Sequence, residues 1–435
     1  MTFAITPQLE SILDPQDIIT KEKINLVWQD RIKKSIDDSC FPDYLLTPPD
    51  IKSLSNTVRV AAKNQSPILP CGSGSKLSWG GIVSDVNLVI STRKLNQVID
   101  YAVSDLTITV EAGTKLRDLQ AILKPHNQFL PIDPVYPENA TIGGIVATAD
   151  TGSWRQRYGG IRDLVLGLSF VRWDGEIAKA GGKVVKNVAG YDLMKLFTGS
   201  YGTLGVISTV TFRLYPIPES SRTLLMIGNA ENISTMAQTL LQSGLQPAAA
   251  EIISPSVVKS LELGEEMGLM VRFQSIPESI EKQSQQLQKI AEQLSIRITF
   301  YQDEIEKNLW QQLQKIIRVP NTNLALTGKI GTIPSQGINW LTKFTELTQD
   351  QGWAMLNLST GIGQFKLDLE PNLGILKQLR LLSQESRGFL TILEASQAIK
   401  KQFEPWGYSG NALPLMKKIK KQFDPQNLFS PSRFI

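Results

Sequence analysis

Three glycine-rich turns in the first half of the chain carry the residues best suited to chemistry. They are PCGSGSK at 70–76, TIGGIVATADTG at 141–152 and GSYGTLGVI at 199–207. Glycine tolerates a positive φ and lets the backbone approach a ligand closely, and successive N–H groups form a concavity that binds an anion. Each turn taken alone is explained by its glycines, which let the chain reverse direction without any ligand. The three together, with short strands between them, predict one extended ligand that carries phosphate.

The common nucleotide motifs do not match these turns. A Walker A loop requires glycine directly before its lysine, and Ser75 precedes Lys76 here. A dinucleotide fingerprint begins well at Gly72 and Gly74, but its third glycine is replaced by Leu77. The sequence therefore supports neither a P-loop ATPase nor an ordinary Rossmann fold.

The scarcity of histidine and cysteine excludes several kinds of site. The chain has one histidine, His126, in a segment that reads as a surface loop after a helix, and it is the only imidazole base available. Its two cysteines, Cys40 and Cys71, form no Cys-x-x-Cys motif. We therefore expect no metal site, no iron–sulfur cluster and two free thiols, as in a reducing compartment.

Charge and hydropathy indicate a globular protein without a membrane span. The net charge is +4 over 435 residues, and both signs are mixed along the chain. No segment approaches the roughly 18 apolar residues of a spanning helix, so we expect a cytoplasmic protein, or one peripheral to the inner face of a membrane. A basic run near the C-terminus favours a solvated helix face over a docking patch for an acidic partner or a membrane: Lys417, Lys418, Lys420 and Lys421.

The lengths and spacing of the predicted elements and turns divide the chain into four parts. They are an N-terminal helical segment (1–40), a glycine-turn domain (41–218), an α+β cap domain (219–395) and a C-terminal segment (396–435) that returns to the glycine-turn domain. After Pro216 and Pro218 the predicted helices and strands become longer, and they follow one another in the order β-α-β-β-α-β. This order predicts a ferredoxin-like sheet with helices on one side. No tandem repeat is recognisable.

Shorter elements of the glycine-turn domain are also predicted. A helix begins after Asp50 with Ile51, Leu54 and Val58 on one face, followed by strands at 87–92 and 106–113 and a helix at 114–124.

Taken together, these segments resemble the FAD-binding domain of the vanillyl-alcohol oxidase and p-cresol methylhydroxylase (PCMH) family. The elements that carry the resemblance occur here in the family's order, at 70–76, 110–113, 141–144, 186–193 and 202–207. Within the family, GGKVVKNVAGYDLMKLFTGSYGTLGVI and the ending FDPQNLFSPSRF are typical of the FAD-binding E subunits of glycolate oxidases. The resemblance implies an α+β protein in which a two-part PCMH-type FAD-binding domain joins a ferredoxin-like cap.

Carried over residue by residue, the resemblance implies a cofactor site built from the turns. Backbone N–H groups of the first turn would hold the pyrophosphate, Lys76 would add charge, and the later turns would line the rest of the FAD. The implied cofactor-binding residues are Pro70, Cys71, Gly72, Ser73, Gly74, Ser75, Lys76, Pro137, Thr141, Ile142, Gly143, Gly144, Thr148, Gly152, Tyr158, Gly202, Val206 and Ile207.

Further positions follow from the same resemblance. Lys186 and Asn187 would lie near the flavin ring, and Asp192 would be a polar anchor or, as we favour, a helix cap. Some relatives attach FAD through a histidine in the first turn. That turn has no histidine here, and attachment through Cys71 is less favoured, so we expect non-covalent FAD.

The resemblance leaves open whether this chain oxidises a substrate itself. Relatives that oxidise 2-hydroxy acids carry cap histidines, a metal, and an Arg and a Thr before the Gly-Tyr-Asp-Leu element. This chain has no histidine in 219–400, and Val185 and Ala189 stand at the other two positions. No catalytic residue is assigned.

The favoured hypothesis is an FAD-bearing subunit of a glycolate or D-lactate dehydrogenase complex, with a sister flavin subunit and an iron–sulfur subunit. A self-sufficient flavin dehydrogenase of another alcohol or hydroxy acid is the alternative, with Arg433, Tyr408, Arg155 and Lys186 as candidate substrate contacts. The intact glycine turns argue against a binding protein that has lost its flavin.

Overall fold

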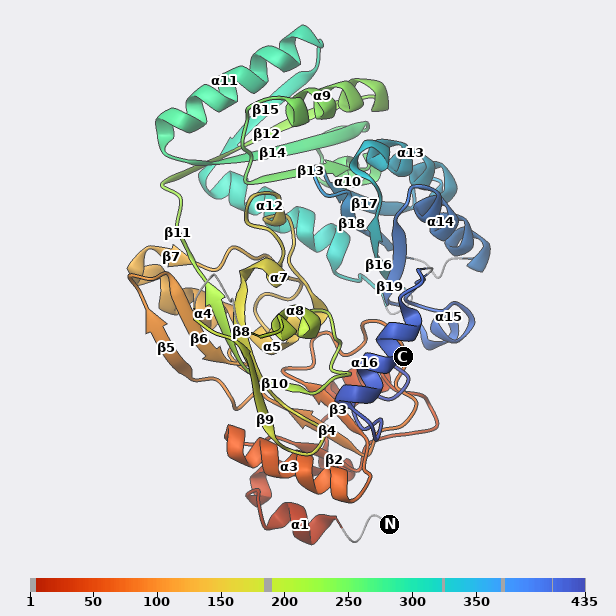
Figure 1. Ribbon diagram of the computed structural model, residues 1–435. Coiled ribbons are helices and arrows are strands. Elements are labelled where there is room, and N and C mark those ends of the chain that lie inside the picture. The colour runs from red at the N-terminus through yellow and green to blue at the C-terminus, as the bar shows by residue number, and fades with distance from the viewer. Residues whose placement is uncertain (1–4, 184–189, 323–324, 369–371, 409, 435) are drawn as a thin grey trace. The chain divides into compact units, whose positions relative to one another are not determined.

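The computed structural model describes residues 5–183, 190–322, 325–368, 372–408 and 410–434. It divides into two compact units. The first unit comprises 1–151, 160–217 and 408–435, and the second comprises 152–159 and 218–407. Residues 408–435 thus belong to the unit that holds the glycine turns, whereas residues 396–407 of the predicted C-terminal segment belong to the second unit (Figure 1).

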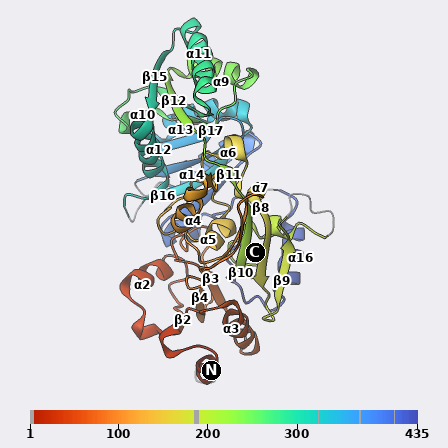
Figure 2. The same cartoon turned by 90° about the vertical axis from the view of Figure 1, so that its left-hand side faces the viewer.

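The described residues of the first unit form a four-stranded sheet, a five-stranded sheet and a short strand pair. In the four-stranded sheet β2, β4 and β3 run parallel and β1 pairs antiparallel with β2. The five-stranded sheet is antiparallel, in the order β5-β6-β10-β8-β9, so that β10, β8 and β9 lie side by side (Figure 2). The strands are β1 (Ile18–Thr20), β2 (Tyr44–Leu46), β3 (Ile68–Cys71), β4 (Leu88–Ser91), β5 (Val98–Ala102), β6 (Thr107–Glu111), β7 (Gln128–Phe129), β8 (Val165–Val171), β9 (Ile177–Gly181), β10 (Val206–Arg213) and β11 (Tyr215–Pro216).

Helices cover the first unit where the sequence has apolar residues at helical spacing. Asp50 caps α3, because its carboxylate accepts the Ser53 N–H at 2.7 Å, and the buried face with Leu54 and Val58 packs on the four-stranded sheet. The predicted helix at this point is confirmed. The helices are α1 (Thr6–Glu10), α2 (Leu26–Lys33), α3 (Ile51–Lys63), α4 (Leu116–Leu123), α5 (Ile142–Thr148), α7 (Ile161–Leu164), α8 (Leu193–Phe197) and α16 (Leu413–Phe423).

The basic run on α16 departs from the prediction at one residue. Lys417, Lys418 and Lys421 are exposed, as expected for a solvated face. Lys420 is buried, with Nζ 2.6 Å from Asp424 Oδ2, so a solvated role for Lys420 is wrong. Its ammonium lies on the side of the helix that faces the protein, where the Asp424 carboxylate compensates the charge.

The second unit contains an eight-stranded antiparallel sheet in the order β15-β12-β14-β13-β17-β18-β16-β19. Its first four strands have the ferredoxin-like order that the β-α-β-β-α-β succession of elements predicts. Its last four strands have the same order, read in the opposite direction across the sheet. The two halves join where β13 pairs with β17. The strands are β12 (Ser220–Gly228), β13 (Ala249–Ile253), β14 (Met267–Ser275), β15 (Arg297–Gln302), β16 (Leu326–Gly331), β17 (Gly352–Asn357), β18 (Ile362–Leu367) and β19 (Phe389–Glu394).

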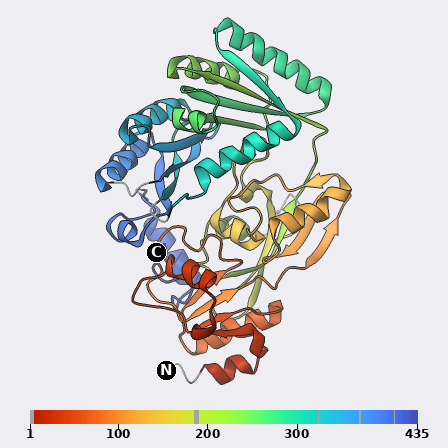
Figure 3. The same cartoon turned by 180° about the vertical axis from the view of Figure 1, so that it is seen from behind.

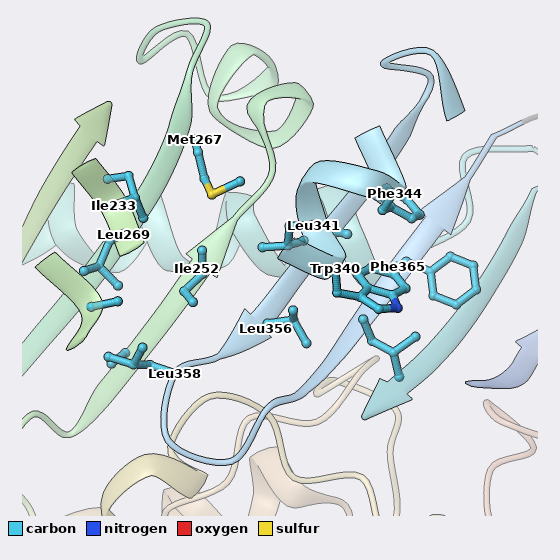
Figure 4. Packing of buried hydrophobic residues seen from close by; sticks show 14 of the residues in the cluster. Ile233, Ile252, Met267, Leu269, Trp340, Leu341, Phe344, Leu356, Leu358 and Phe365 are labelled. Atoms are coloured by element: carbon cyan, nitrogen blue, oxygen red, sulfur yellow. The ribbon is translucent and has the colours of Figure 1, made fainter. Parts of the chain in front are cut away.

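Helices cover both faces of this sheet, so the prediction of helices on one side is wrong. Helices α9, α11, α13, α14 and α15 contribute buried residues to the core around Trp340 and Phe365 on one face (Figure 4). Helices α10 and α12 pack on the other face around Met270 and Leu313, and α12 crosses the sheet in Figure 3. Strand residues alternate between the two cores, as the two-residue period requires. The helices are α6 (Arg155–Tyr158), α9 (Ala230–Gln242), α10 (Pro255–Ser260), α11 (Pro277–Gln293), α12 (Asp303–Arg318), α13 (Gly337–Thr348), α14 (Leu373–Glu385) and α15 (Gln397–Gln402).

Further expectations concern the two cysteines, the histidine, a membrane span and a metal site. Cys40 and Cys71 are both free thiols, as predicted. His126 is exposed at the end of a short 3-10 turn, in edge-to-face contact with Tyr101, which confirms a surface position. Within the described ranges no helix has the length and apolarity of a membrane span, and no cluster of three or more His, Cys, Asp or Glu side chains is placed to bind a metal.

A candidate cofactor cleft

The three glycine turns meet at one cleft within the first unit. The cleft has a volume of about 720 Å³, part of it open to solvent, and the C-terminal Arg433 joins the turns in its wall. Its lining residues are Pro70, Cys71, Gly72, Ser73, Gly74, Ser75, Lys76, Leu77, Thr92, Ala140, Thr141, Gly143, Gly144, Ala147, Thr148, Ser200, Tyr201, Gly202, Gly205, Val206, Ile207 and Arg433.

The first turn follows directly on strand β3 and is fixed by its carbonyl groups. Ser91 Oγ donates to the Gly72 carbonyl at 2.6 Å, and Arg31 donates to the Ser73 carbonyl at 2.7 Å. Gly74 has a φ of +77°, and a Cβ there would lie 2.9 Å from the Trp28 ring. In the described part of the chain, the backbone N–H groups of Ser73, Gly74 and Ser75 donate to no acceptor. Three successive donors of this kind suit a phosphate group.

The second turn begins the short helix α5 and touches the first. Thr141 precedes this helix, and a Cβ on Gly72 would lie 1.9 Å from Thr141 Oγ1. On its other side Gly143 donates to the Ala112 carbonyl at 2.8 Å, where a Cβ would lie 2.8 Å from Ala112 Cβ. The glycines therefore permit backbone approaches on both sides of this turn that a side chain would prevent.

The third turn lies against α5. Gly199 donates to the Val146 carbonyl at 3.0 Å and Tyr201 donates to the Ala147 carbonyl at 2.8 Å. Gly202 has a φ of +71° and packs against Pro70 of the first turn. The chain then enters β10 at Val206. Hydrogen bonds and glycine contacts thus hold the three turns as one wall.

A buried ion pair lies beside the first turn. Lys76 Nζ is 2.6 Å from Asp150 Oδ2, with both side chains at most 5% exposed. The same carboxylate oxygen accepts the Val135 N–H at 2.8 Å. We expected Lys76 to add positive charge to the cleft, and the structure places the Asp150 carboxylate against that charge. The pair therefore ties the turn to the segment at 133–135.

Burial shifts the pKa of three ionisable side chains of the cleft, Cys71, Tyr201 and Arg433, toward the neutral form. Burial raises the pKa of the Cys71 thiol to about 12 and raises the pKa of the Tyr201 hydroxyl far above its usual value. Burial also lowers the pKa of the Arg433 guanidinium to about 10, which still leaves it charged at pH 7. Neither Cys71 nor Tyr201 is suited to act as a base at neutral pH. The cleft is built to bind a ligand, and it offers no poised proton acceptor among these groups.

Most of the site residues predicted from the sequence line this cleft, and four do not. Pro137 is exposed, and Ile142 lies fully buried in the core of the first unit. Gly152 and Tyr158 fall in the second unit, whereas every lining residue belongs to the first. Lys186 and Asn187, and with them Val185 and Ala189, lie outside the described residues.

The other candidate residues have local structural contacts. Asp192 occupies the position before α8, but its carboxylate pairs with Lys195 at 2.8 Å and does not cap the helix. The Tyr408 hydroxyl accepts the Ala412 N–H at 2.9 Å. Arg155 begins α6 in the second unit. Of the three candidate substrate contacts that the structure describes, Arg433 alone lines the cleft.

Sequence reasoning missed several lining residues for two different reasons. Ala147, Ser200 and Tyr201 lie inside the quoted turns but match no residue of the family elements, whereas Gly205 lies in the element at 202–207 and was not assigned a cofactor contact. Leu77 and Ala140 flank a turn, and only their proximity could have suggested them. Thr92 follows strand β4 with no local signal, and it reaches the cleft because β4 pairs with β3.

These residues fit a flavin dinucleotide. The N–H groups of the first turn suit a diphosphate, and the apolar side chains of Pro70, Leu77, Val206 and Ile207 suit the faces of aromatic rings. The fit rests on backbone donors and apolar walls, which is the donor set that such a ligand requires.

Comparisons with known proteins agree with this fit. Residues 42–181 match the family described as an FAD binding domain, and residues 398–434 match the C-terminal domain of FAD linked oxidases. The structure is similar to p-cresol methylhydroxylase with substrate bound, with a TM-score of 0.78 and 13% identity over 99% of this chain and 96% of the other. It is also similar to 4-ethylphenol oxidase from Gulosibacter chungangensis, with a TM-score of 0.76 and 14% identity over 99% and 96% of the two chains.

Three curated relatives differ in how much of their length is matched. Glycolate oxidase subunit GlcD of Bacillus subtilis is 34% identical over 52% of this chain and 49% of its own length. A probable mitochondrial D-lactate dehydrogenase of Danio rerio is 32% identical over 50% and 44%. The chain thus spans about half the length of these relatives. Glycolate oxidase subunit GlcE of Escherichia coli is 27% identical over 88% of this chain and 96% of its own length.

The chain is therefore an α+β protein of the PCMH-type fold. Residues 42–181 match an FAD binding domain, residues 398–434 match the C-terminal domain of FAD linked oxidases, and FAD is the cofactor of this chain.

Proposed function

We propose that this chain is the FAD-binding subunit of a glycolate oxidase or dehydrogenase complex that oxidises a 2-hydroxy acid, glycolate or D-lactate, to the 2-oxo acid. The observation that carries the proposal is the match to glycolate oxidase subunit GlcE, which extends over 88% of this chain and 96% of that subunit. The other relatives match only part of their own length, so their names bear less on the whole chain.

Bound FAD supplies the capacity to accept a hydride and pass electrons on one at a time. The residues of this chain would bind and orient it. The N–H groups of Ser73, Gly74 and Ser75 would hold the diphosphate, the second and third turns would line its length, and Val206 and Ile207 would pack at the adenine end. The cofactor-binding assignment covers the predicted residues that line the cleft, and FAD is held without a covalent bond.

The side chains of this chain favour a supporting role over direct substrate oxidation. The single histidine is exposed and does not line the cleft, and the second unit contains no histidine in its sequence. Burial keeps Cys71 and Tyr201 protonated at pH 7. A sister flavin subunit would then perform the substrate chemistry. Because two separated cysteines cannot bind an iron–sulfur cluster, a further subunit would receive the electrons. The cytoplasmic location expected from the sequence stays a prediction.

A self-sufficient dehydrogenase is the second candidate. Relatives named D-lactate dehydrogenase, such as that of Anaerostipes hadrus at 30% identity over 51% of this chain, favour it. The two candidates differ in whether the isolated chain can reduce its own flavin.

Anaerobic titration of the purified chain tests both candidates. We expect a yellow protein whose flavin absorbance does not bleach with glycolate or D-lactate, but bleaches with dithionite as a control. Bleaching by either hydroxy acid would replace the supporting role with direct catalysis. A protein that is colourless after gentle purification and does not bind added FAD would contradict both.

A further inference from the structure

Arg433 is a buried cation in the wall of the cofactor cleft. Its side chain is 4% exposed, and it lines the cleft with the residues of the first and third turns. One guanidinium nitrogen, Nη2, donates to the carbonyl of Leu77, directly after the first turn. A residue from the end of the chain thus contacts the loop whose N–H groups suit a phosphate.

The backbone of the C-terminal segment fixes this position. Ser430 donates to the Ile68 carbonyl at 2.8 Å, at the start of strand β3. Ser84 donates to the Pro431 carbonyl at 3.1 Å, and Arg433 itself donates to the Ser430 carbonyl at 3.1 Å. These bonds hold the arginine on a rigid part of the first unit, so its guanidinium needs no large rearrangement to meet a ligand.

Two basic side chains, Lys76 and Arg433, line the cleft. The Lys76 ammonium lies against the Asp150 carboxylate at 2.6 Å. The Arg433 guanidinium contacts the Leu77 carbonyl and interacts with the Tyr201 hydroxyl and the Cys71 thiol, and burial keeps the hydroxyl and the thiol neutral at pH 7. A diphosphate brings negative charge into the same low-dielectric space, where attraction to a buried guanidinium is stronger than in water.

We propose that Arg433 binds the diphosphate of the FAD and positions the first turn around it, so that this arginine of the C-terminal segment sets the cofactor's affinity. The inference rests on the proposed role of this chain as an FAD-binding subunit. It gives Arg433 a cofactor contact in place of the substrate contact considered from the sequence. A guanidinium suits this role because its planar fork can engage a carbonyl and a phosphate oxygen together.

Binding of ADP and of adenosine to the flavin-free chain, each measured by competition against FAD, separates the diphosphate from the rest of the ligand. The variants are Arg433→Met, which removes the charge, and Arg433→Lys, which keeps a charge but loses the fork. Lys417→Met, which removes an exposed lysine of α16, is the matched control. The measured quantity is the ratio of the adenosine to the ADP dissociation constant.

We expect Arg433→Met to lower this ratio, and the affinity for FAD, by about 10- to 100-fold, as for loss of a hydrogen bond to a charged group. Arg433→Lys should lower the ratio about threefold and Lys417→Met should leave it unchanged. An equal loss of ADP and adenosine affinity, or no loss of either, would overturn the proposal. If Arg433→Met does not fold, an unchanged ratio in Arg433→Lys overturns it. A wild-type chain that binds no FAD would contradict the proposed function instead.

Discussion

Lys420 Nζ lies 2.6 Å from Asp424 Oδ2, one helical turn further along, and both side chains are buried. The same ammonium donates to the carbonyls of Thr203 and Phe429, each at 2.9 Å. One lysine therefore joins helix α16, the third glycine turn and the C-terminal segment. Because Thr203 stands between the lining residues Gly202 and Gly205, this contact links the end of the chain to the cofactor cleft.

Replacement of Lys420 by methionine should destabilise the first unit by about 3–5 kcal/mol, because it leaves the Asp424 carboxylate buried without its counter-charge. Urea unfolding measures this loss, and the affinity for FAD should fall with it. Lys417→Met on the exposed side of the same helix should change the unfolding free energy by less than about 0.5 kcal/mol. Equal effects of the two substitutions would mean that the buried ion pair has no special role.

The basic run shows why some of this arrangement escaped prediction. Four lysines in five positions read as a solvated face, and for three of them the structure agrees. The Lys420–Asp424 spacing is visible in the sequence, but an i, i+4 pair looks the same on either side of a helix. Only the packing of α16 decides which side is buried. By contrast, the glycine turns were predictable because a ligand cradle requires particular residues in a fixed order.

Gly74→Ala should weaken FAD binding about tenfold, since the alanine must adopt a φ of +77° and its Cβ would lie 2.9 Å from the Trp28 ring. A left-handed backbone costs a non-glycine residue about 1–2 kcal/mol, and relief of that strain would move the N–H groups of the first turn. Flavin fluorescence titration of the flavin-free chain measures the affinity. Gly244→Ala, where a Cβ meets no atom within 4 Å, is the control. Unchanged affinity in Gly74→Ala would show that this turn does not hold the cofactor.

Denaturation should release all of the flavin from the protein. The first turn has no histidine, and a thiol with a pKa of about 12 has almost no thiolate at pH 7 to attack the ring. After acid precipitation the yellow colour should remain in the supernatant, as it should for Cys71→Ala. A fluorescent protein band on a denaturing gel, lost in the Cys71→Ala variant, would establish a covalent bond through this thiol.

The second unit shows a different limit of sequence reasoning. The order of elements from β12 to β15 predicted one ferredoxin-like set of strands, and the same topology recurs from β16 to β19. This repeated topology cannot be recognised in the sequence, because two segments with the same fold need only the same spacing of apolar residues and not the same residues. The helix α12 was not predicted, and its amphipathic pattern would not indicate which side of the sheet it covers.

A buried ion pair between Arg272 of β14 and Glu306 of α12 gives the last prediction. Arg272 Nε lies 2.9 Å from Glu306 Oε1, and this oxygen also accepts from Thr223 Oγ1 at 2.6 Å and Ser221 Oγ at 2.8 Å. Glu306→Gln should destabilise the second unit by about 3–5 kcal/mol, because it removes the carboxylate charge that lies against the buried Arg272 guanidinium. Glu304→Gln on the exposed side of α12 should cost less than about 1 kcal/mol.

A double substitution distinguishes this charge effect from a simple loss of packing. Replacing Arg272 by methionine together with Glu306→Gln removes both charges, so the double variant should be more stable than Glu306→Gln alone. Urea unfolding of the four proteins in the cycle gives the coupling free energy. If the two losses simply add, the buried carboxylate acts through its hydrogen bonds to Thr223 and Ser221, and the arginine acts through contacts such as that with the Trp310 ring, 4.4 Å away.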